Sequence, residues 1–318
     1  MRCLWLENRE LRYREDIEIG ALPDQEALVK VNLAGICQTD LELVNGYYPF
    51  TGIIGHEFVG TIASAPDSPE RVGQRVVGEI NAACGNCQYC LKGHARHCPD
   101  RTVLGIVDRN GAFADFLTLP LKNLIPIPDQ ISNEAAIFTE PLAAALQIQA
   151  QVDLQANDRI LLIGAGKLGM LIAMSLRQSD LNLTVLVRHQ FQQKLLHNLG
   201  VQAEFQSNLT EEKFDIVIDA SGSRNGFEDS LHYLRPRGKL ILKSTYSGET
   251  LVDLAHLVVD EIEIIGSRCG AFEPAIQLLL QNRIDPTVLL SERFPIEEGL
   301  AAFASASLPG KWKVAIEF

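Results

Sequence analysis

Short apolar runs with period-two alternation dominate the chain up to about residue 125. Examples are ALVKVNLAGI at 27–36, FVGTIA at 58–63 and QRVVGEI at 74–80, which are separated by Gly, Pro and Asn turns. Alternation of this kind is typical of strands that bury one face, and helical periodicity is scarce here. The pattern therefore predicts a strand-rich first domain.

A different pattern begins at residue 133. A helix-forming stretch at 133–151 leads into an apolar strand at 159–164. Further strands are predicted at 183–188, 214–221 and 239–245, with helices at 168–179, 192–199 and around 227–234. Because parallel strands are joined by crossovers that are usually helices, this alternation predicts one doubly wound α/β domain of the Rossmann type.

The pattern changes once more after EIEIIGS at 261–267. A helix is predicted at 271–282, a strand around Val288 and a terminal strand at 312–318. We therefore divide the chain into three segments, residues 1–140, 141–269 and 270–318. The last segment is expected to return to the strand-rich domain.

Composition and charge limit the classes of function. The chain has 318 residues, of which 47% are hydrophobic and 21% charged, and this suits a globular protein of two domains. The formal net charge of -12 and the lack of a Lys/Arg cluster argue against a nucleic-acid partner. The N-terminus lacks the apolar core of a secretory signal, and the longest apolar stretch, 160–174, is too short to cross a bilayer. We expect a cytoplasmic protein without a membrane segment.

Four cysteines in the run CGNCQYCLKGHARHC are the densest chemical signal. They are Cys84, Cys87, Cys90 and Cys98. Four thiolates in one lobe at 84–98 suit a tetrahedral zinc ion with Zn–S distances of about 2.3 Å, in a closed structural site. An iron–sulfur cluster is the alternative, although the last spacing fits the ferredoxin pattern badly. Disulfides are disfavoured, because the total of 7 cysteines is odd and no secretion signal is present.

A glycine-rich loop follows the strand at 159–164. Its residues are Gly164, Ala165, Gly166, Lys167, Leu168 and Gly169. They match GxGxxG at a strand-to-helix turn. There the glycines allow a tight turn, close approach of a pyrophosphate and close helix packing, while the helix N-terminus offers N–H donors to the phosphates. The sequence predicts a dinucleotide site.

The end of the second Rossmann strand bears on the choice of dinucleotide. The acidic residue that usually holds the ribose 2′-hydroxyl is absent, and Arg188 stands in its place, about 20 residues beyond Gly169. Arg188, with His189 or Lys194, can pair with the 2′-phosphate of NADP. We therefore favour NADP(H) over NAD(H), with a merely solvated arginine as the alternative.

Three further fragments carry possible metal ligands: GICQTDLELVNG at 35–46, GHEFVG at 55–60 and TEPLAAAL at 139–146. Each is weak alone, since a single cysteine, histidine or glutamate is more often structural. Together with the four-cysteine lobe, GAGKLG and the C-terminal GKWKVAIEF, they occur in the order typical of one family. Over essentially its whole length the chain resembles the zinc-containing medium-chain dehydrogenase/reductase family.

The resemblance implies a catalytic zinc held by Cys37, His56 and Glu140, the last as in the sorbitol and threonine dehydrogenase branch. Three protein ligands leave a fourth position for water or a substrate oxygen. Glu57 is similar to an acid that lies behind the metal in the family, and Asp40 matches the carboxylate that orients the histidine ligand.

The resemblance also assigns a proton relay and a cofactor contact. Thr39 fills the position whose hydroxyl binds the substrate oxygen and starts the relay. Glu42 stands where many relatives have a histidine, so either Glu42 accepts the proton or another route to solvent exists. Lys313, in GKWKV, lies where relatives place a basic residue on the cofactor pyrophosphate.

The implied architecture is a GroES-like, strand-rich catalytic domain with a structural zinc lobe, joined to a Rossmann domain. The implied function is an NAD(P)-linked oxidation of a small alcohol or polyol to its aldehyde or ketone, by a homodimer or homotetramer with two zinc ions per chain. Substrate choice is expected to depend on pocket residues such as Tyr47, Tyr48, Phe50 and Ile80. Two alternatives from other classes are an iron–sulfur electron-transfer or sensor protein and a catalytically silent NADP-binding regulator.

Overall fold

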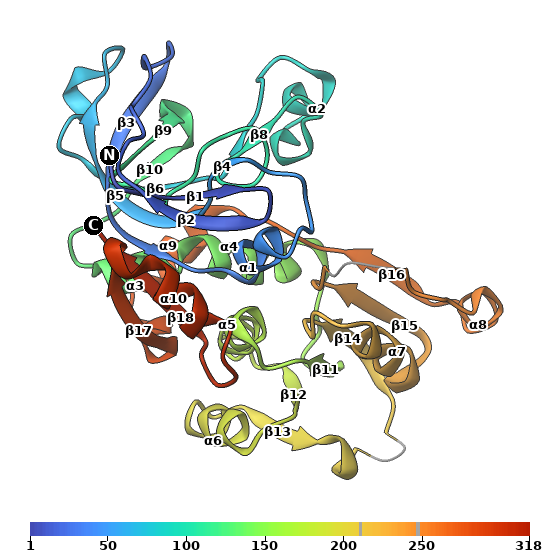
Figure 1. The fold of residues 1–318 in the computed structure, drawn as a ribbon. Helices are drawn as coiled ribbons and strands as arrows, with labels where there is room; N and C mark the ends of the chain where they lie inside the picture. The colour runs from blue at the N-terminus through green and yellow to red at the C-terminus, as the bar shows by residue number, and fades with distance from the viewer. Residues whose placement is uncertain (210–211, 246–248) are drawn as a thin grey trace. The chain divides into compact units, whose positions relative to one another are not determined.

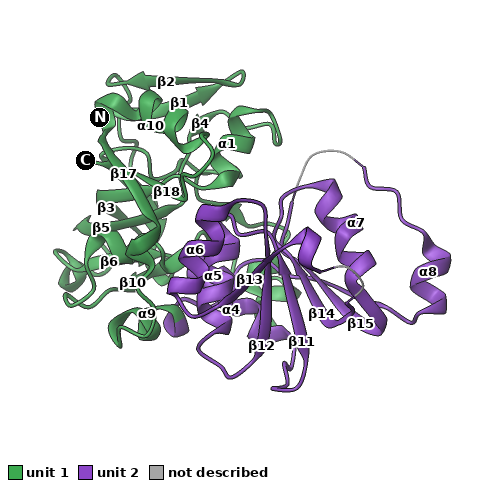
Figure 2. Cartoon of the chain, turned by 90° about the horizontal axis from the view of Figure 1, so that it is seen from below, with its two compact units in different colours: residues 1–140, 275–318 green, residues 141–274 purple. Residues whose placement is uncertain are grey.

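The computed structural model describes residues 1–209, 212–245 and 249–318 (Figure 1). It divides into two compact units, Met1–Glu140 with Ala275–Phe318 and Pro141–Pro274 (Figure 2). The first boundary coincides with the one drawn from the sequence. The second lies at 274/275 instead of 269/270, because Gly270 packs directly against the backbone of Ala143 in the second unit.

The first unit is built mainly of strands. Its strands are β1 (Cys3–Glu7), β2 (Glu10–Arg14), β3 (Glu26–Gly35), β4 (Gly52–Ile53), β5 (Glu57–Ser64), β6 (Arg75–Gly78), β7 (Asn81–Ala82), β8 (Thr102–Val103), β9 (Phe116–Pro120), β10 (Leu124–Pro126), β17 (Leu290–Pro295) and β18 (Lys313–Glu317). The largest sheet has the order β10-β6-β5-β3-β18-β17, and β9 also pairs with β3. Smaller sheets are β2-β1-β4 and β7-β8. The predicted strand-rich domain is confirmed.

Strand β3 is the centre of this sheet and leads to the candidate site. Most of its side chains are buried, as expected for a central strand. Its last residue, Gly35, pairs with Glu57 of β5 on one side and with Ala315 of β18 on the other. The C-terminal strand β18 and the early strand β5 therefore flank the end of β3.

The helices of the first unit are short. They are α1 (Gln38–Val44), α2 (Gln88–Leu91), α3 (Asn133–Ala136) and α10 (Gly299–Ala306). The helix predicted at 133–151 is interrupted after α3 and resumes as α4 (Thr139–Gln151). Thr139 bonds back to the carbonyl of Ala136 through its hydroxyl, and Pro141 lies in the first turn of α4, where its missing N–H costs no helical bond.

The second unit contains the predicted parallel sheet. Its strands are β11 (Arg159–Ile163), β12 (Asn182–Val187), β13 (Gln202–Phe205), β14 (Phe214–Asp219), β15 (Leu234–Leu242) and β16 (Glu263–Gly266). They are all parallel, in the order β13-β12-β11-β14-β15-β16. Helices α5 (Lys167–Leu176), α6 (Gln190–Asn198), α7 (Arg224–Tyr233) and α8 (Leu254–Val259) complete it. Its apolar core includes Leu161, Val217, Phe214, Tyr233 and Leu240. The Rossmann architecture is confirmed.

One local prediction near the C-terminus needs correction. The strand expected around Val288 is a 3-10 turn, η5 (Pro286–Leu289), and β17 follows it. Asp285 caps this turn through the N–H of Thr287, and Pro286 cannot donate to a strand ladder. The predicted helix at 271–282 is α9 (Phe272–Leu280). Within the described residues, no helix is both long and apolar enough to span a bilayer.

Candidate catalytic and cofactor sites

Cys37, His56 and Glu57 come together at the end of β3. Each offers one ligand atom, and these atoms lie within 4.8 Å of one another. Cys37 is the N-cap of α1, while His56 directly precedes β5 and Glu57 is its first residue. His56 and Glu57 are buried, and Cys37 is partly exposed. A partly exposed thiol with a buried imidazole and a buried carboxylate at this spacing is a donor set that fits zinc.

Asp40 faces His56 from the first turn of α1. Its Oδ1 lies 3.2 Å from Nδ1 of His56, and its Oδ2 accepts the backbone N–H of Cys37 at 2.8 Å. The Asp40 side chain is fully buried. Burial alone lowers the pKa of His56, but Asp40 and Cys37 raise it well above its usual value. Because Nδ1 faces Asp40, Nε2 is the nitrogen left for a metal.

Glu140 lies near this group at the start of α4, in its partly buried first turn. Burial raises its pKa to about 7, and His56 opposes that rise while the negative charge of Glu57 adds to it. Glu140 is outside the group whose ligand atoms lie within 4.8 Å of one another. The carboxylate closest to Cys37 and His56 is thus Glu57, whereas the sequence pointed to Glu140.

Lys313, which was predicted to contact the cofactor pyrophosphate, is paired with a carboxylate in the first unit. It is almost fully buried in the first unit, where its ammonium forms an ion pair with Glu57. The pairing follows from the sheet, since β18 lies beside β3 and β3 beside β5. The ammonium of Lys313 is therefore paired with Glu57, a carboxylate of the candidate metal site.

The expected relay residues lie on α1. The Thr39 hydroxyl is 3.8 Å from the sulfur of Cys37. Glu42 lies one turn further and accepts a hydrogen bond of 2.9 Å from Gln38 on the exposed side of the helix. The structure thus places Thr39 beside the donor set and Glu42 toward solvent.

The expected pocket residues have unequal surroundings. Tyr47 and Tyr48 are exposed, with ring centroids 6.4 Å apart, and Ile80 is buried. Phe50 packs next to Gly52, where an added Cβ would lie 3.4 Å from its ring. The tyrosines are therefore available to a ligand, and Ile80 contributes to the core.

The four cysteines of the lobe converge. Their sulfur–sulfur distances are 3.4 Å for Cys84–Cys98, 3.5 Å for Cys87–Cys90, 3.8 Å for Cys87–Cys98 and 3.9 Å for Cys84–Cys90. A tetrahedron with Zn–S bonds of about 2.3 Å has edges of about 3.8 Å. Backbone N–H groups of Asn86 and Cys87 lower the pKa of Cys84 to about 7, which favours a thiolate. The lobe fits a tetrahedral metal, and the distances are too long for disulfides.

The glycine-rich loop has the geometry that a dinucleotide needs. Gly164 has φ of +103°, and a Cβ there would lie 2.7 Å from the carbonyl oxygen of Ala220. Gly169 is similarly tight, since a Cβ would lie 1.9 Å from the carbonyl oxygen of Gly164. Gly166 is the N-cap of α5 and has open space in front of it. Lys167 and Leu168 begin the helix. This loop leaves room for a pyrophosphate at the helix N-terminus.

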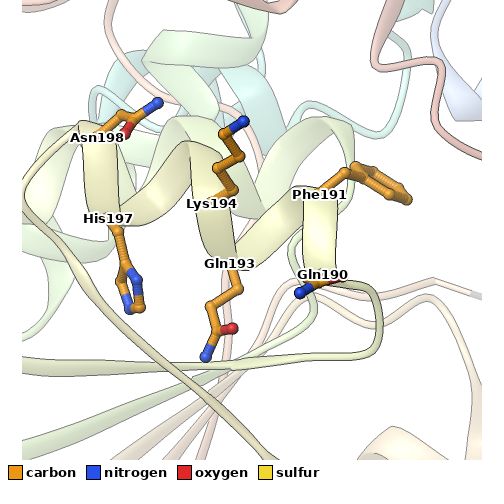
Figure 3. Close-up of a pocket in the computed structure, with 6 residues that line it drawn as sticks. All are labelled: Gln190, Phe191, Gln193, Lys194, His197 and Asn198. Carbon is orange, nitrogen blue, oxygen red and sulfur yellow. The ribbon is translucent and has the colours of Figure 1, made fainter.

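Arg188 follows β12 directly and is exposed. His189 stacks on Phe191, with ring centroids 5.3 Å apart and an interplanar angle of 9°. Beside it, α6 borders an open cavity of about 680 Å³ lined by Gln190, Phe191, Gln193, Lys194, His197 and Asn198. Lys194 and Asn198 point to one side of α6, and Gln193 and His197 to the other (Figure 3).

Gln192 is a further residue of the cofactor site, and it was not among the residues predicted from the sequence. Its side-chain oxygen accepts the N–H groups of Arg188 and His189, both at 3.1 Å, and its amide donates to the carbonyl of Ala165 at 3.0 Å. It thus ties the residues after β12 to the glycine-rich loop. The sequence signal for this role is a glutamine three residues after His189, the N-cap of α6, which is the spacing of a capping box.

Comparison with known proteins decides the family. Residues 23–129 match the alcohol dehydrogenase GroES-like domain, and residues 168–281 match the zinc-binding dehydrogenase model. L-threonine 3-dehydrogenase of Xanthomonas campestris pv. campestris (strain B100) is 32% identical over 247 residues, which cover 72% of each chain. The chain belongs to the zinc-containing medium-chain dehydrogenase/reductase family.

Three further proteins are similar to this chain over nearly its whole length. D-arabitol-phosphate dehydrogenase of Enterococcus avium is 28% identical over 326 residues, covering 95% of this chain and 92% of that protein. The crystal structure of an alcohol dehydrogenase from Escherichia coli CFT073 complexed with NADH has a TM-score of 0.91 and 27% identity, covering 100% of this chain and 99% of that one. A zinc-binding dehydrogenase from Sinorhizobium meliloti 1021, bound to NADP, shares the fold at 23% identity, with a TM-score of 0.90 and the same coverage.

This medium-chain dehydrogenase is a zinc-type enzyme that uses a nicotinamide cofactor and interconverts an alcohol or polyol with its carbonyl compound. The predicted family, fold class and dehydrogenase function are confirmed. The comparisons give no support to an iron–sulfur protein or to a silent regulator.

Proposed function

We propose that this enzyme oxidises a small polyol-like alcohol with NADP, at a zinc site formed by Cys37, His56 and Glu140. The observation that carries the proposal is the group of Cys37, His56 and Glu57 at one end of β3, together with Glu140, whose pKa responds to the charges of His56 and Glu57. Polyol-like substrates are supported by relatives named for threonine and arabitol phosphate. The exposed rings of Tyr47 and Tyr48 offer apolar and hydroxyl surface to such a substrate.

Glu140 is the better third ligand because Glu57 is already paired. Glu57 is held by Lys313, whereas in the described part of the chain Glu140 has neither a hydrogen bond nor an ion pair. A carboxyl group that is desolvated and unpaired favours binding of a cation. Together with the thiolate of Cys37, Glu140 would balance the two positive charges of zinc.

The protein's own groups then position and move protons. When bound, zinc supplies Lewis acidity to the alcohol oxygen and the nicotinamide accepts the hydride. Asp40 fixes the tautomer of His56. Thr39, 3.8 Å from Cys37, binds the substrate hydroxyl and takes its proton, and Glu42 at the solvent side of α1 is the acceptor we propose for the end of the relay.

A second zinc ion in the cysteine lobe is the other metal that we propose. The four sulfur–sulfur distances of 3.4 to 3.9 Å support it. A closed site of four thiolates leaves no position for a substrate, so this metal stabilises the lobe at 84–98 and takes no part in the reaction. The expected content is two zinc ions per chain.

NADP is the preferred cofactor in this proposal. In the described residues Arg188 has no ion-pair partner, so its guanidinium is available to a 2′-phosphate, and His189 and Lys194 add positive or donor groups nearby on the same segment. Lys313 is removed from the set of cofactor contacts, because its ammonium is buried against Glu57. Backbone N–H groups at the start of α5 take over the pyrophosphate.

We further propose a homodimer formed by the edge of the Rossmann sheet, in a cytoplasmic enzyme. Strand β16 is the edge strand, and β16 and α8 expose Leu254, Val258, Val259 and Ile264. An edge strand whose outer side has no neighbouring strand in the described part of the sheet, and which lies beside exposed apolar side chains, is suited to pairing with the same strand of a second copy. Sedimentation of wild-type protein and of Ile264→Lys tests this, since the charged edge is expected to give a monomer.

A spectrophotometric screen tests the function as a whole. Alcohols and polyols are offered with NADP and NAD in parallel, to wild-type enzyme and to Arg188→Asp. We expect Arg188→Asp to lower kcat/KM for NADP by about 10- to 150-fold, which corresponds to a charge-assisted hydrogen bond of about 1.5–3 kcal/mol, and to leave NAD less affected. Arg159→Gln, at the start of β11 and thus at the other end of the parallel strands, is the control. Equal loss with both cofactors would contradict the assignment of Arg188.

A further inference from the structure

Lys313 is the buried cation of the candidate zinc site. Only 2% of its surface is exposed, and its ammonium donates to Oε2 of Glu57. The carbonyl oxygen of Ile36 lies 3.5 Å from the same nitrogen, and the ring of Phe138 has its centroid 5.6 Å away. An ammonium so enclosed is costly without a carboxylate, so the pair stays together in the folded protein.

Gly35 leaves the space that the pair occupies. A Cβ at this residue would lie 2.7 Å from Oε2 of Glu57 and 3.1 Å from Cδ of Lys313. Gly35 is paired in register with Glu57 across the sheet, so the position of the carboxylate is fixed from the backbone. The side chain of Glu57 thus rests in a cleft formed by β3 and the lysine.

The candidate zinc site is surrounded by more negative groups than a zinc ion needs, and the ion pair of Lys313 with Glu57 neutralises one of them. Cys37, Asp40, Glu57 and Glu140 are four acidic groups near one another, whereas zinc needs only two negative ligands to be neutral. A carboxylate oxygen of Glu57 lies within 4.8 Å of the sulfur of Cys37 and of a ring nitrogen of His56. Without Lys313, this carboxylate is free to approach the same metal.

We infer that Lys313 is a positioning residue that holds Glu57 out of the zinc coordination sphere and so keeps the fourth position open for the substrate oxygen. This inference rests on the proposed zinc site. It differs from a pyrophosphate role, because Lys313 acts here through Glu57 and leaves cofactor affinity unchanged.

The test compares wild-type enzyme with Lys313→Met, a neutral side chain of similar length, after the catalytic metal has been exchanged for cobalt while zinc remains in the cysteine lobe. Four-coordinate cobalt absorbs visible light more strongly than five-coordinate cobalt. We expect Lys313→Met to weaken the visible band and to lower kcat about 10- to 100-fold, the range seen when groups that orient metal ligands are lost. The Kd of NADP is expected to stay the same.

Two further variants make the result specific. Lys313→Arg keeps the charge and is expected to retain the wild-type spectrum. Lys313→Met with Glu57→Gln removes the competing ligand and the unpaired charge together, so the four-coordinate spectrum is expected to return. Should Lys313→Met fail to accumulate, Lys313→Leu, which likewise cannot donate to Glu57, is measured in its place, with Lys313→Leu and Glu57→Gln combined as its control.

The outcomes separate the inference from the proposed function. If the wild-type protein binds no metal at Cys37 and His56, the proposed zinc site is wrong. If it binds cobalt, and Lys313→Met shows an unchanged spectrum and unchanged kcat, the positioning role is wrong. A weaker affinity for NADP in Lys313→Met with an unchanged spectrum would restore the pyrophosphate role and overturn this one.

Discussion

Replacing Asp40 by asparagine separates the effects of its charge from those of its shape. The carboxylate has two partners, Nδ1 of His56 at 3.2 Å and the N–H of Cys37 at 2.8 Å, and it is fully buried. An amide has one accepting oxygen, so it can serve only one of them. If the oxygen stays with Cys37, the NH2 group faces His56 and favours the tautomer whose Nε2 carries a proton, which cannot bind a metal.

The magnitude follows from the contact that is lost. A hydrogen bond to a charged group contributes about 1.5–3 kcal/mol, equivalent to about 10- to 150-fold in zinc affinity. Losses of 10- to 100-fold are common for groups that orient a metal-bound histidine. Asp40→Ala also removes the capping bond to Cys37, so we expect it to lower the free energy of unfolding by about 1 kcal/mol beyond the effect on zinc.

Zinc affinity is measured by competition with a chelator, and the free energy of unfolding by urea titration of the zinc-free protein. Glu42→Gln is the matched control, because Glu42 lies on the same helix and its bond to Gln38 is exposed. It is expected to bind zinc as tightly as the wild type. If Asp40→Asn also binds zinc as tightly, then His56 is oriented by something other than Asp40 and the argument fails.

Three other changes test separate parts of the molecule. Cys98→Ser should release one zinc ion and lower the thermal midpoint, whereas Cys269→Ser, a cysteine outside the lobe, should do neither; metal analysis with calorimetry decides. Gln192→Ala should raise the KM of both NADP and NAD, because it removes the hydrogen bonds to Arg188 and to Ala165 of the glycine-rich loop, and an unchanged KM for NAD would contradict this role. In zinc-free protein the raised pKa of Glu140, about 7, means that the folded state binds this proton more tightly than the unfolded state. Stability should therefore fall as the pH rises from the ordinary carboxyl range to about 7, and urea titrations of Glu140→Gln should lack this component of the slope.

The parts that could be predicted from the sequence are local in the chain. The GxGxxG motif spans only a few residues. Gly164 has a positive φ and Gly169 packs closely against Gly164, and the spacing of the glycines is enough to predict both features. The cysteine lobe is similar, because its ligands lie between residues 84 and 98. The alternation of strands and helices in the second unit was likewise predictable from periodicity, whereas the break at 137–138 in the helix expected at 133–151 was not predicted.

The parts that could not be predicted depend on pairing between distant strands. Lys313 and Glu57 are separated by 256 residues in the chain, and they meet because β18 and β5 flank β3. A lysine in an alternating strand predicts only which face it occupies, not which neighbour the sheet supplies. That is why the pairing of Lys313 with Glu57 could not be predicted from the sequence.

The two candidate metal sites differ in how many segments of the chain supply their ligands. This difference explains why only the site at the end of β3 needs a further residue to restrain a neighbouring carboxylate. In the lobe, four cysteines supply every ligand from one short segment, so a folded loop is enough to close the site. At the end of β3, the proposed ligands Cys37, His56 and Glu140 come from three segments, and a carboxylate oxygen of Glu57 lies within 4.8 Å of the ligand atoms of Cys37 and His56. An open coordination position can persist there only if that carboxylate has another partner. The buried ammonium of Lys313 is that partner, so the reactivity of the site depends as much on the group that restrains a possible ligand as on the ligands themselves.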